Sequence, residues 1–274
     1  MILEMLKNRL IPNIICNNGN VVQSKNFKHT NVVGNAVTAV DFFNAWAVDE
    51  LLVLDVSRTK IHRKKFHKII DGLSKRCVVP LSVGGWITEV DEIKKFLDEG
   101  ADKIVINTHA VKNPGFVRET SSIFGSQCIV ISIDVKRNES GKSEVFIDRG
   151  RENTGYDPVE WAKKVEELGA GEILLTSIDR DGTKKGYDLE LIKSVTDAIK
   201  IPVIAFGGVG KWDDFVDGIK IANSDAVSAA NIFHHVEQST YNAKEHMINE
   251  GLNVRIPKFY KLPTLRKPKY LDIY

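Results

Sequence analysis

Short apolar segments alternate with amphipathic helical segments along the chain, and this alternation limits the possible folds more than any other feature. The apolar segments are rich in Val, Ile and Leu and do not alternate with polar residues, which is typical of strands covered on both faces. They are Leu10–Cys16, Leu51–Val56, Val79–Val83, Lys103–Ile106, Ile129–Asp134, Ile173–Ile178, Ile201–Phe206 and Ala226–Ala229. Helical patterns lie between them, for example at Asp91–Glu99, Pro158–Leu168 and Leu189–Ile199. Eight strands with intervening helices predict an α/β protein with one closed (β/α)8 barrel, since an open doubly wound sheet usually needs fewer strands.

An internal repeat divides this barrel into two similar halves. The segment DELLVLDVSRT (49–59) resembles GEILLTSIDRDGT (171–183), and VPLSVGGW (79–86) resembles IPVIAFGGVG (201–210). Pairing Glu50 with Glu172 gives an offset of 122 residues, and pairing Gly84 with Gly207 gives 123. Two motifs in the same order at nearly one offset predict half-barrels at about 1–123 and 124–254 within a single domain. Residues 255–274 depart from the pattern and are expected to form a short C-terminal extension.

The composition is that of an ordinary globular chain with balanced charge. Its 274 residues suit one barrel, which typically needs about 250. The 38 basic and 36 acidic residues give a net charge of +2, which provides no general attraction to nucleic acid or a membrane. No apolar segment approaches the ~20 residues of a membrane span, and the first ten residues carry charges unlike a signal-peptide core. We expect a cytoplasmic protein in which Cys16, Cys77 and Cys128 are buried thiols.

Small and polar residues follow the strands at the end of a barrel where active sites lie. Two glycine pairs stand at repeat-related positions, where backbone N–H groups can approach a phosphate closely. Each pair is followed one strand later by a small or polar pair: Gly84 and Gly85 precede Asn107 and Thr108, and Gly207 and Gly208 precede Ala230 and Asn231. This pattern predicts two phosphate cradles and a small phosphorylated ligand. There is no metal-ligand cluster, and we expect neither a metal nor a cofactor.

Several long motifs resemble one enzyme family, and together they span residues 9–255. They include RLIPNIICNNGNVV, GADKIVINTHAVKNP, FGSQCIVISIDVKR and GAGEILLTSIDRDGTKKGYD. They are similar to HisF, the cyclase subunit of imidazole glycerol phosphate synthase. The resemblance implies a TIM barrel that receives ammonia from a separate glutaminase, HisH, bound at the bottom of the barrel. It implies that ammonia crosses the barrel axis. At the top, ammonia would cleave and cyclise a bis-phosphorylated ribulose-type substrate.

The resemblance implies two catalytic aspartates that act as general acid and base, but this chain keeps one of them. The family aspartate at the end of the fifth strand matches Asp134, whereas its partner position at the end of the first strand holds Ile15. Isoleucine cannot transfer a proton. The repeat shows the same difference, because Ile15 and Asp134 end the first strand of each half. A family lysine in the loop after the first strand falls at Gln23.

Other positions of the mouth are partly changed relative to the family. Large or different side chains replace small ones at Trp86, Arg149, Phe206 and Asn231, which suggests a reshaped pocket. Residues that match family mouth residues keep the pocket polar, namely Asp55, Thr176, Asp179 and Asp181. At the opposite end, the family has a salt-bridged ring of four charged residues through which ammonia enters. Its matches are Arg9, Glu50, Lys103 and Glu172.

A retained ammonia gate beside a missing acid leaves three hypotheses, and leaves open whether the chain itself catalyses a reaction. In the first, the barrel passes ammonia from a HisH-like glutaminase to a sugar-modifying amidotransferase at the mouth. HisF-like relatives in acetamidino-sugar clusters of surface polysaccharides, such as lipopolysaccharide, also resemble this chain in the stretch NFKHTNVVGNAVTAVDFFN (26–44). In the second, the chain is a working cyclase of histidine biosynthesis. In the third, it is a non-catalytic scaffold that activates a glutaminase.

Overall fold

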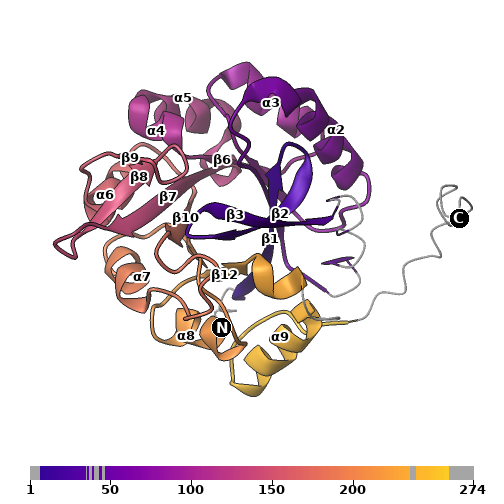
Figure 1. The fold of residues 1–274 in the computed structure, drawn as a ribbon, viewed down its shortest axis with the longest axis vertical. Coiled ribbons are helices and arrows are strands. Elements are labelled where there is room, and N and C mark those ends of the chain that lie inside the picture. Colours follow the sequence, from indigo (N-terminus) through magenta and orange to yellow (C-terminus); the bar gives the residue numbers. More distant parts are fainter. Residues whose placement is uncertain are drawn as a thin grey trace, which may run out of the picture.

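The computed structural model describes residues 7–34, 36, 39, 43–44, 47–234 and 239–258. Within these ranges, strands occupy the centre of the molecule and helices surround them, as Figure 1 shows. Of the expected C-terminal extension at 255–274, residues 259–274 lie outside the described residues. The described part contains no helix with the length and apolar character needed to cross a membrane.

Eight parallel strands close into one barrel, which confirms the predicted (β/α)8 fold. Neighbouring strands follow the order β10, β11, β12, β1, β4, β5, β6 and β7, and pairing of β7 with β10 closes the ring. The predicted segments Lys103–Ile106 and Ala226–Ala229 coincide with strands, whereas the strand predicted at Val79–Val83 begins at Leu81. The strands are β1 (Arg9–Asn17), β4 (Leu51–Asp55), β5 (Leu81–Gly84), β6 (Lys103–Ile106), β7 (Ile129–Arg137), β10 (Glu172–Ser177), β11 (Val203–Phe206) and β12 (Ala226–Ala229).

Helices form the outer ring, and their local sequences explain where they begin. The helix α6 begins at Pro158, where Asp157 accepts hydrogen bonds from the backbone N–H groups of Val159 and Glu160. The helix predicted to run to Ile199 ends earlier, at Thr196. The α-helices are α2 (Arg63–Ser74), α3 (Val90–Asp98), α4 (Thr108–Lys112), α5 (Gly115–Phe124), α6 (Pro158–Glu167), α7 (Leu189–Thr196), α8 (Asp213–Lys220) and α9 (Ser239–Asn249). Short 3-10 helices are η1 (Lys60–His62), η2 (Ser126–Cys128) and η3 (Asn231–His234).

The barrel wall separates two apolar clusters, because successive strand residues point to opposite faces. On β1, Leu10, Ile14 and Cys16 pack toward the helices. Ile11 and Ile15 point into the barrel, where they belong to a cluster with Leu52, Val105, Val130, Leu174, Ile204, Phe206 and Ala226. Side chains from several strands therefore fill the interior, as in other barrels of this type.

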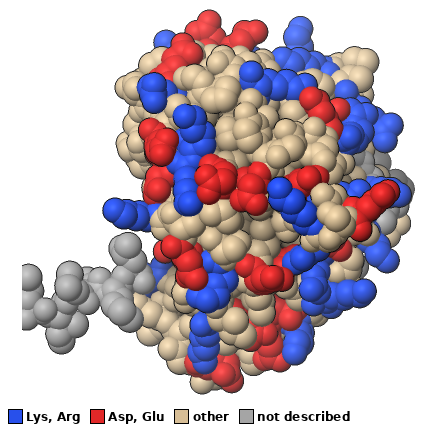
Figure 2. Space-filling model, turned by 90° about the vertical axis from the view of Figure 1, so that its left-hand side faces the viewer, with Lys and Arg blue, Asp and Glu red and all other residues tan. Residues whose placement is uncertain are grey.

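The three thiols are less uniformly buried than expected. Cys16 is buried, and Cys77 and Cys128 are half-buried; all three are free thiols. Burial raises the pKa of Cys16 to about 12, so this thiol stays protonated near neutral pH. In Figure 2, acidic and basic side chains are interspersed on the visible face, in agreement with the balanced composition.

A β-hairpin follows the first strand of each half, which the sequence patterns did not predict. In the first half, β2 (Asn20–Lys25) and β3 (Lys28–Gly34) continue antiparallel from β1. In the second half, β8 (Ser143–Ile147) and β9 (Glu152–Asn153) continue antiparallel from β7. Both hairpins leave the barrel at the carboxyl ends of the strands. They therefore add residues to the mouth.

The strand register supports the repeat but shifts one of its pairings. Leu54 pairs with Gly84 between β4 and β5, and Thr176 pairs with Phe206 between β10 and β11. Gly84 is thus equivalent to Phe206, not to Gly207 as the motif alignment suggested, and the offset is 122 residues for both motifs. Gly207 is equivalent to Gly85, and both have positive φ, at 95° and 112°.

Candidate functional site

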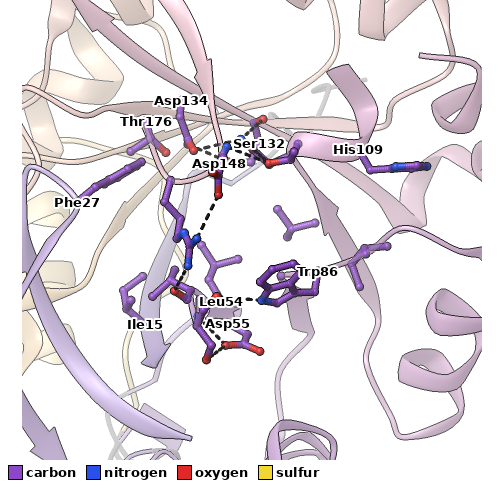
Figure 3. Close-up of a pocket in the computed structure, with 18 of the residues that line it drawn as sticks. Ile15, Phe27, Leu54, Asp55, Trp86, His109, Ser132, Asp134, Asp148 and Thr176 are labelled. Atoms are coloured by element: carbon purple, nitrogen blue, oxygen red, sulfur yellow. Dashed lines mark hydrogen bonds and ion pairs between the residues drawn. The ribbon is translucent and has the colours of Figure 1, made fainter. Parts of the chain in front are cut away.

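A cavity of about 300 Å³ lies at the carboxyl ends of the strands and brings together most of the residues expected at the mouth. Figure 3 shows polar side chains such as Asp134 and Thr176 on one side and Ile15 and Leu54 on the opposite side. Expected residues that line it are Asp55, Gly85, Asn107, Thr108, Asp134, Thr176 and Asp181. The cavity also includes the departures Ile15, Trp86, Arg149 and Phe206.

Asp134 stands at the centre of the polar side. Asn107 Nδ2 donates to Asp134 Oδ2 at 3.1 Å, and Ser132 Oγ donates to Oδ1 at 3.2 Å. Burial raises the pKa of Asp134 to about 7, because desolvation and the nearby Asp181 outweigh the hydrogen bonds from Ser132, Thr176 and Asn107. A carboxyl group that titrates near neutral pH can both accept and donate a proton there.

The other carboxylates of the cavity have strong fixed partners. Asp55 accepts hydrogen bonds from the Ser57 backbone N–H at 3.0 Å and from Ser57 Oγ at 2.5 Å, and Arg63 Nη1 lies 3.5 Å from its Oδ2. Asp181 Oδ2 accepts from Ser24 Oγ at 2.8 Å and from the Phe27 backbone N–H at 3.1 Å. Among these aspartates, Asp134 is thus the one best suited to proton transfer.

The side of the cavity around Ile15 is apolar. Ile15 is 6% exposed and belongs to the barrel-interior cluster with Phe206 and Ala230, against which Leu54 and Val56 pack. Ile15 is the register partner of Leu54 on β4. Asp55, at the end of the neighbouring strand β4, lines the same cavity but is held by Ser57 and lies beside Arg63. The two sides of the cavity therefore differ in chemistry, since Asp134 lies on the polar side and the carboxylate near Ile15 is fixed by its partners.

Arg149 places a guanidinium in the mouth between the two halves. It lies in the turn between β8 and β9, and both it and Asp148 have positive φ, at 60° and 50°. Its Nη1 donates to Val56 O at 3.3 Å, and its Nη2 donates to Asp148 Oδ1 at 3.1 Å. The Asp148 backbone N–H also donates to Thr108 Oγ1 at 3.1 Å, which ties this turn to the end of β6.

The two expected cradles lie in separate hollows. Of the first cradle, Gly85, Asn107 and Thr108 open into the large cavity, beside Trp86. At Gly85, a Cβ atom would lie 2.3 Å from Asp55 O, so this close backbone approach requires glycine. The second cradle comprises Gly207, Gly208, Ala230 and Asn231 and surrounds a hollow of about 20 Å³. Gly84, expected beside Gly85, lines neither hollow: a Cβ there would lie 2.7 Å from Leu54 Cδ2 and 2.8 Å from Val105 Cβ.

Four charged residues at the opposite end of the barrel form a closed ring of ion pairs. Arg9 bonds Glu50 at 2.9 Å and also bonds Glu172. Lys103 Nζ lies 2.9 Å from a carboxylate oxygen of each of the same two glutamates. Burial lowers the pKa of Arg9, but attraction to Glu172 and Glu50 outweighs it, so the pKa is raised overall. The side chains of Glu50 and Glu172 are 3% and 7% exposed, so each depends on these cations for compensation.

Unpaired polar groups lie inside the barrel between this ring and the mouth. On the inward face of β1, the order from the ring to the mouth is Arg9, Ile11, Asn13 and Ile15. Asn13 is 1% exposed, and neither its Oδ1 nor its Nδ2 has a hydrogen-bond partner among the described residues. The same is true of the buried Oγ of Ser228, the register partner of Ile11 on β12. Such groups favour a small polar guest in an otherwise apolar interior.

Several of these residues were not found from the sequence. Ser24 and Phe27 reach the cavity on the β2–β3 hairpin, which the Asn18–Gly19 dipeptide before it could have indicated. Ser132 could have been found from its spacing, since it stands two residues before Asp134 on the same face of β7. No group of three or more possible metal ligands is found within the described ranges.

Comparison with known proteins agrees with this geometry. The model of a family described as "Histidine biosynthesis protein" matches residues 9–239. A protein of Vibrio vulnificus (strain YJ016) is 45% identical over 253 residues, which cover 92% of this chain and 93% of that protein. Its name is "Putative imidazole glycerol phosphate synthase subunit hisF2". Its closed barrel, its motifs and these similarities show that the chain belongs to the histidine biosynthesis protein family, as a member of its HisF group.

Proposed function

We propose that this chain is the barrel subunit of a cytoplasmic glutamine amidotransferase system. It receives ammonia from a HisH-like glutaminase at the end that carries the ion-pair ring and releases it at the mouth. The observation that carries the proposal is the contrast between the two ends. The ring of Arg9, Glu50, Lys103 and Glu172 is complete, whereas the mouth has Ile15 in place of a proton-transfer group.

The ring supports the ammonia-entry role because its carboxylates are buried and its cations are partly exposed. Glu50 and Glu172 are nearly buried, while the side chains of Arg9 and Lys103 remain 26% and 20% exposed. A cation on the outer side can swing into solvent, whereas the carboxylates are held beneath it. Ser82 Oγ also donates to Glu50 at 2.6 Å, which fixes one carboxylate in place. The unpaired groups of Asn13 and Ser228 lie beyond this ring and suit a small polar molecule such as ammonia.

The mouth supports transfer to another enzyme better than cyclisation in place. Cyclisation requires proton transfers on both faces of a substrate, and the wall around Ile15 offers an apolar surface. We propose that the ammonia acceptor is bound by a sugar-modifying amidotransferase, which makes an amino or acetamidino sugar for a surface polysaccharide. We also propose that the main cavity binds a small phosphorylated ligand.

A second candidate, the cyclase of histidine biosynthesis, is favoured by one observation. Asp134 has a pKa of about 7 and lies in the main cavity, so one of the two proton transfers still has a suitable group. The candidates separate when the purified chain is given the bis-phosphorylated ribulose-type substrate and ammonium salt. Our proposal predicts no significant turnover. Turnover at the rate of a two-aspartate cyclase would replace it with the second candidate.

The conduit itself is tested by isotope competition. The chain, its HisH-like glutaminase and the sugar amidotransferase are mixed with amide-15N glutamine and an excess of unlabelled ammonium. A conduit predicts that the sugar product keeps most of its 15N, since the transferred ammonia does not mix with solvent. Equal dilution of the label by bulk ammonium would contradict the conduit. Continued stimulation of glutamine hydrolysis in that case would favour a non-catalytic scaffold.

The gate is tested in the same assay with Lys103→Met. Removal of this cation leaves Glu50 and Glu172 with Arg9 alone, which opens the ring. We expect a large loss of 15N retention while glutamine hydrolysis continues, because ammonia would then exchange with bulk ammonium. The matched control is Lys94→Met, which removes an exposed lysine of α3 away from the ring.

A further inference from the structure

We infer that Phe206 restricts the mouth to ligands with one phosphate, held at the first cradle, and excludes ligands that need both cradles. The inference rests on the proposed function for the statement that the mouth binds a small phosphorylated molecule. The ligand class is a molecule with a single phosphate, and Phe206 is the residue that selects it.

Phe206 and Asp181 form a partition between the two cradles. Both residues line the large cavity and also the small hollow of the second cradle. Phe206 is 6% exposed and packs in the barrel-interior cluster with Ile15 and Ala230. Asp181 is held from the other side by Ser24. The partition is therefore fixed by contacts on both sides and does not depend on one mobile side chain.

The strand register explains why the partition exists in one half only. Phe206 is equivalent to Gly84, since they are the partners of Thr176 and Leu54 in the two halves. Gly84 has no side chain, and Gly85 beside it lines the large cavity. At the equivalent position of the second half, the benzyl group of Phe206 separates the second cradle from the large cavity. The two halves share one backbone plan, but at this position only the second half carries a large side chain between its cradle and the main cavity.

The second cradle is also unsuited to a phosphate by its size and chemistry. Its hollow of about 20 Å³ has room for about one water molecule. Asn231 Nδ2 donates to Ser24 O at 2.8 Å, which leaves Asn231 Oδ1 buried without a described partner. The carboxylate-bearing Asp181 lines the same hollow. An acceptor oxygen and a carboxylate repel an anion and favour a donor such as water.

The first cradle offers more space and has cations beside it. It opens to a cavity of about 300 Å³ that is lined by Arg149 and Lys112, although Lys112 also pairs with Glu152 at 3.0 Å and Asp181 lines this cavity too. The Arg149 guanidinium bonds Val56 O and Asp148, which accounts for two of its N–H donors and leaves others for a ligand oxygen. The Asp148 backbone N–H donates to Thr108 Oγ1, so Arg149 is held next to this cradle. One anionic group can be neutralised here, while the rest of the ligand reaches Asp134 and the apolar wall.

Binding of three probes to the chain in complex with its glutaminase tests the inference. Inorganic phosphate, ribose 5-phosphate and ribulose 1,5-bisphosphate are titrated by calorimetry. We expect the pentose monophosphate and the bisphosphate to bind with dissociation constants within about threefold of each other, since the second phosphate gains no site. In Phe206→Ser combined with Asn231→Ser, we expect the bisphosphate to gain about tenfold over the monophosphate. Phe206→Leu is the matched control, because it keeps an apolar partition.

The outcomes that overturn the inference are distinct. Wild-type protein that binds the bisphosphate about tenfold more tightly than the monophosphate would contradict it, as would the absence of binding of any probe. An unchanged ratio in the folded double variant would also contradict it. If that variant does not fold, crystals of the wild-type complex grown with inorganic phosphate decide: phosphate at Gly85 and Thr108 alone supports the inference, and phosphate at Gly207 overturns it. The isotope assay of the wild type tests the conduit separately.

Discussion

Ile15 and Asp134 occupy equivalent positions of the two half-barrels, as register partners of Leu54 and Thr176. The same backbone position therefore presents a buried methyl surface in one half and a carboxyl with a pKa of about 7 in the other. Each side chain lies among neighbours of similar polarity. Ile15 packs in an apolar cluster, and Asp134 accepts hydrogen bonds from Asn107 and Ser132. The asymmetry thus involves the surroundings of each position as well as the residue itself.

We expect Ile15→Asp alone not to create cyclase turnover. The new carboxyl would be buried among Phe206, Leu54 and Val56, where desolvation disfavours its charged form and costs about 1–3 kcal/mol of stability. Phe206 would still separate the cradles. Turnover of the bis-phosphorylated substrate is measured for Ile15→Asp with and without Phe206→Ser, and Ile15→Asn controls for polarity. Turnover in Ile15→Asp with Phe206 unchanged would show that the partition does not exclude this substrate.

The raised pKa of Asp134 predicts a pH dependence of stability with a definite sign. The folded pKa is about 7 and the ordinary value is 3.8, so between these values the folded chain holds a proton that the unfolded chain has lost. This contribution to stability is therefore largest below pH 4, falls as pH rises, and levels off above about pH 7. The full difference corresponds to at most about 4 kcal/mol. Urea unfolding of wild type and Asp134→Asn at pH 5 and pH 8 checks it: the variant should lose less stability between the two pH values.

The fold was predictable because eight short apolar segments alternate with amphipathic helical segments along the chain. Segments such as Lys103–Ile106 are apolar throughout, since both faces of the strand are covered. The ion-pair ring was also recognisable, because its members stand at the starts of strands, or directly before one in the case of Glu50, where the family resemblance places them. Their geometry then follows from the barrel, which brings Arg9, Glu50, Lys103 and Glu172 to one end.

The shape of the mouth was not predictable from the same patterns. Each hairpin continues a barrel strand, so the apolar pattern of β1 does not show that Ser24 and Phe27 return to the cavity. The motif alignment paired Gly84 with Gly207 because both begin a glycine pair, and only the strand register revealed Phe206 opposite Gly84. Phe206 was recognisable as a large side chain at the mouth, but the sequence did not show that it lines both hollows.

A buried lysine beside the gate gives a prediction that is independent of ammonia transfer. Lys244 of α9 is 0% exposed and bonds Ala47 O at 2.6 Å and Asp49 Oδ1 at 2.5 Å. Burial lowers the pKa of Lys244 despite the attraction of Asp49. We expect Lys244→Met to lower the free energy of unfolding by about 2–3 kcal/mol, since Asp49 keeps Arg255 as a partner but loses its buried cation. Chemical denaturation of wild type and variant measures this change in the free energy of unfolding.

The control for Lys244→Met is Lys220→Met, which removes a cation from an exposed pair with Glu250 on the same side of the molecule. Exposed pairs contribute about 0–1 kcal/mol, so this variant should unfold close to wild type. Equal losses in the two variants would show that the contacts of Lys244 with Ala47 and Asp49 do not hold α9 against the strand starts.

Asn13 should show opposite effects on stability and on transport. Its amide is buried in the barrel interior without a described partner, so Asn13→Leu removes an unsatisfied polar group and fills the space with apolar atoms. We expect stability to stay equal or to rise by about 1 kcal/mol, because an apolar group of similar volume carries no desolvation penalty. Retention of 15N from glutamine should fall by about tenfold, since the polar side chain that could bind ammonia between Arg9 and Ile15 is lost. Asn13→Ser keeps a polar group and should retain most of the label. If Asn13→Leu transfers ammonia as well as wild type does, the guest molecule of Asn13 is a structural water and the route passes elsewhere.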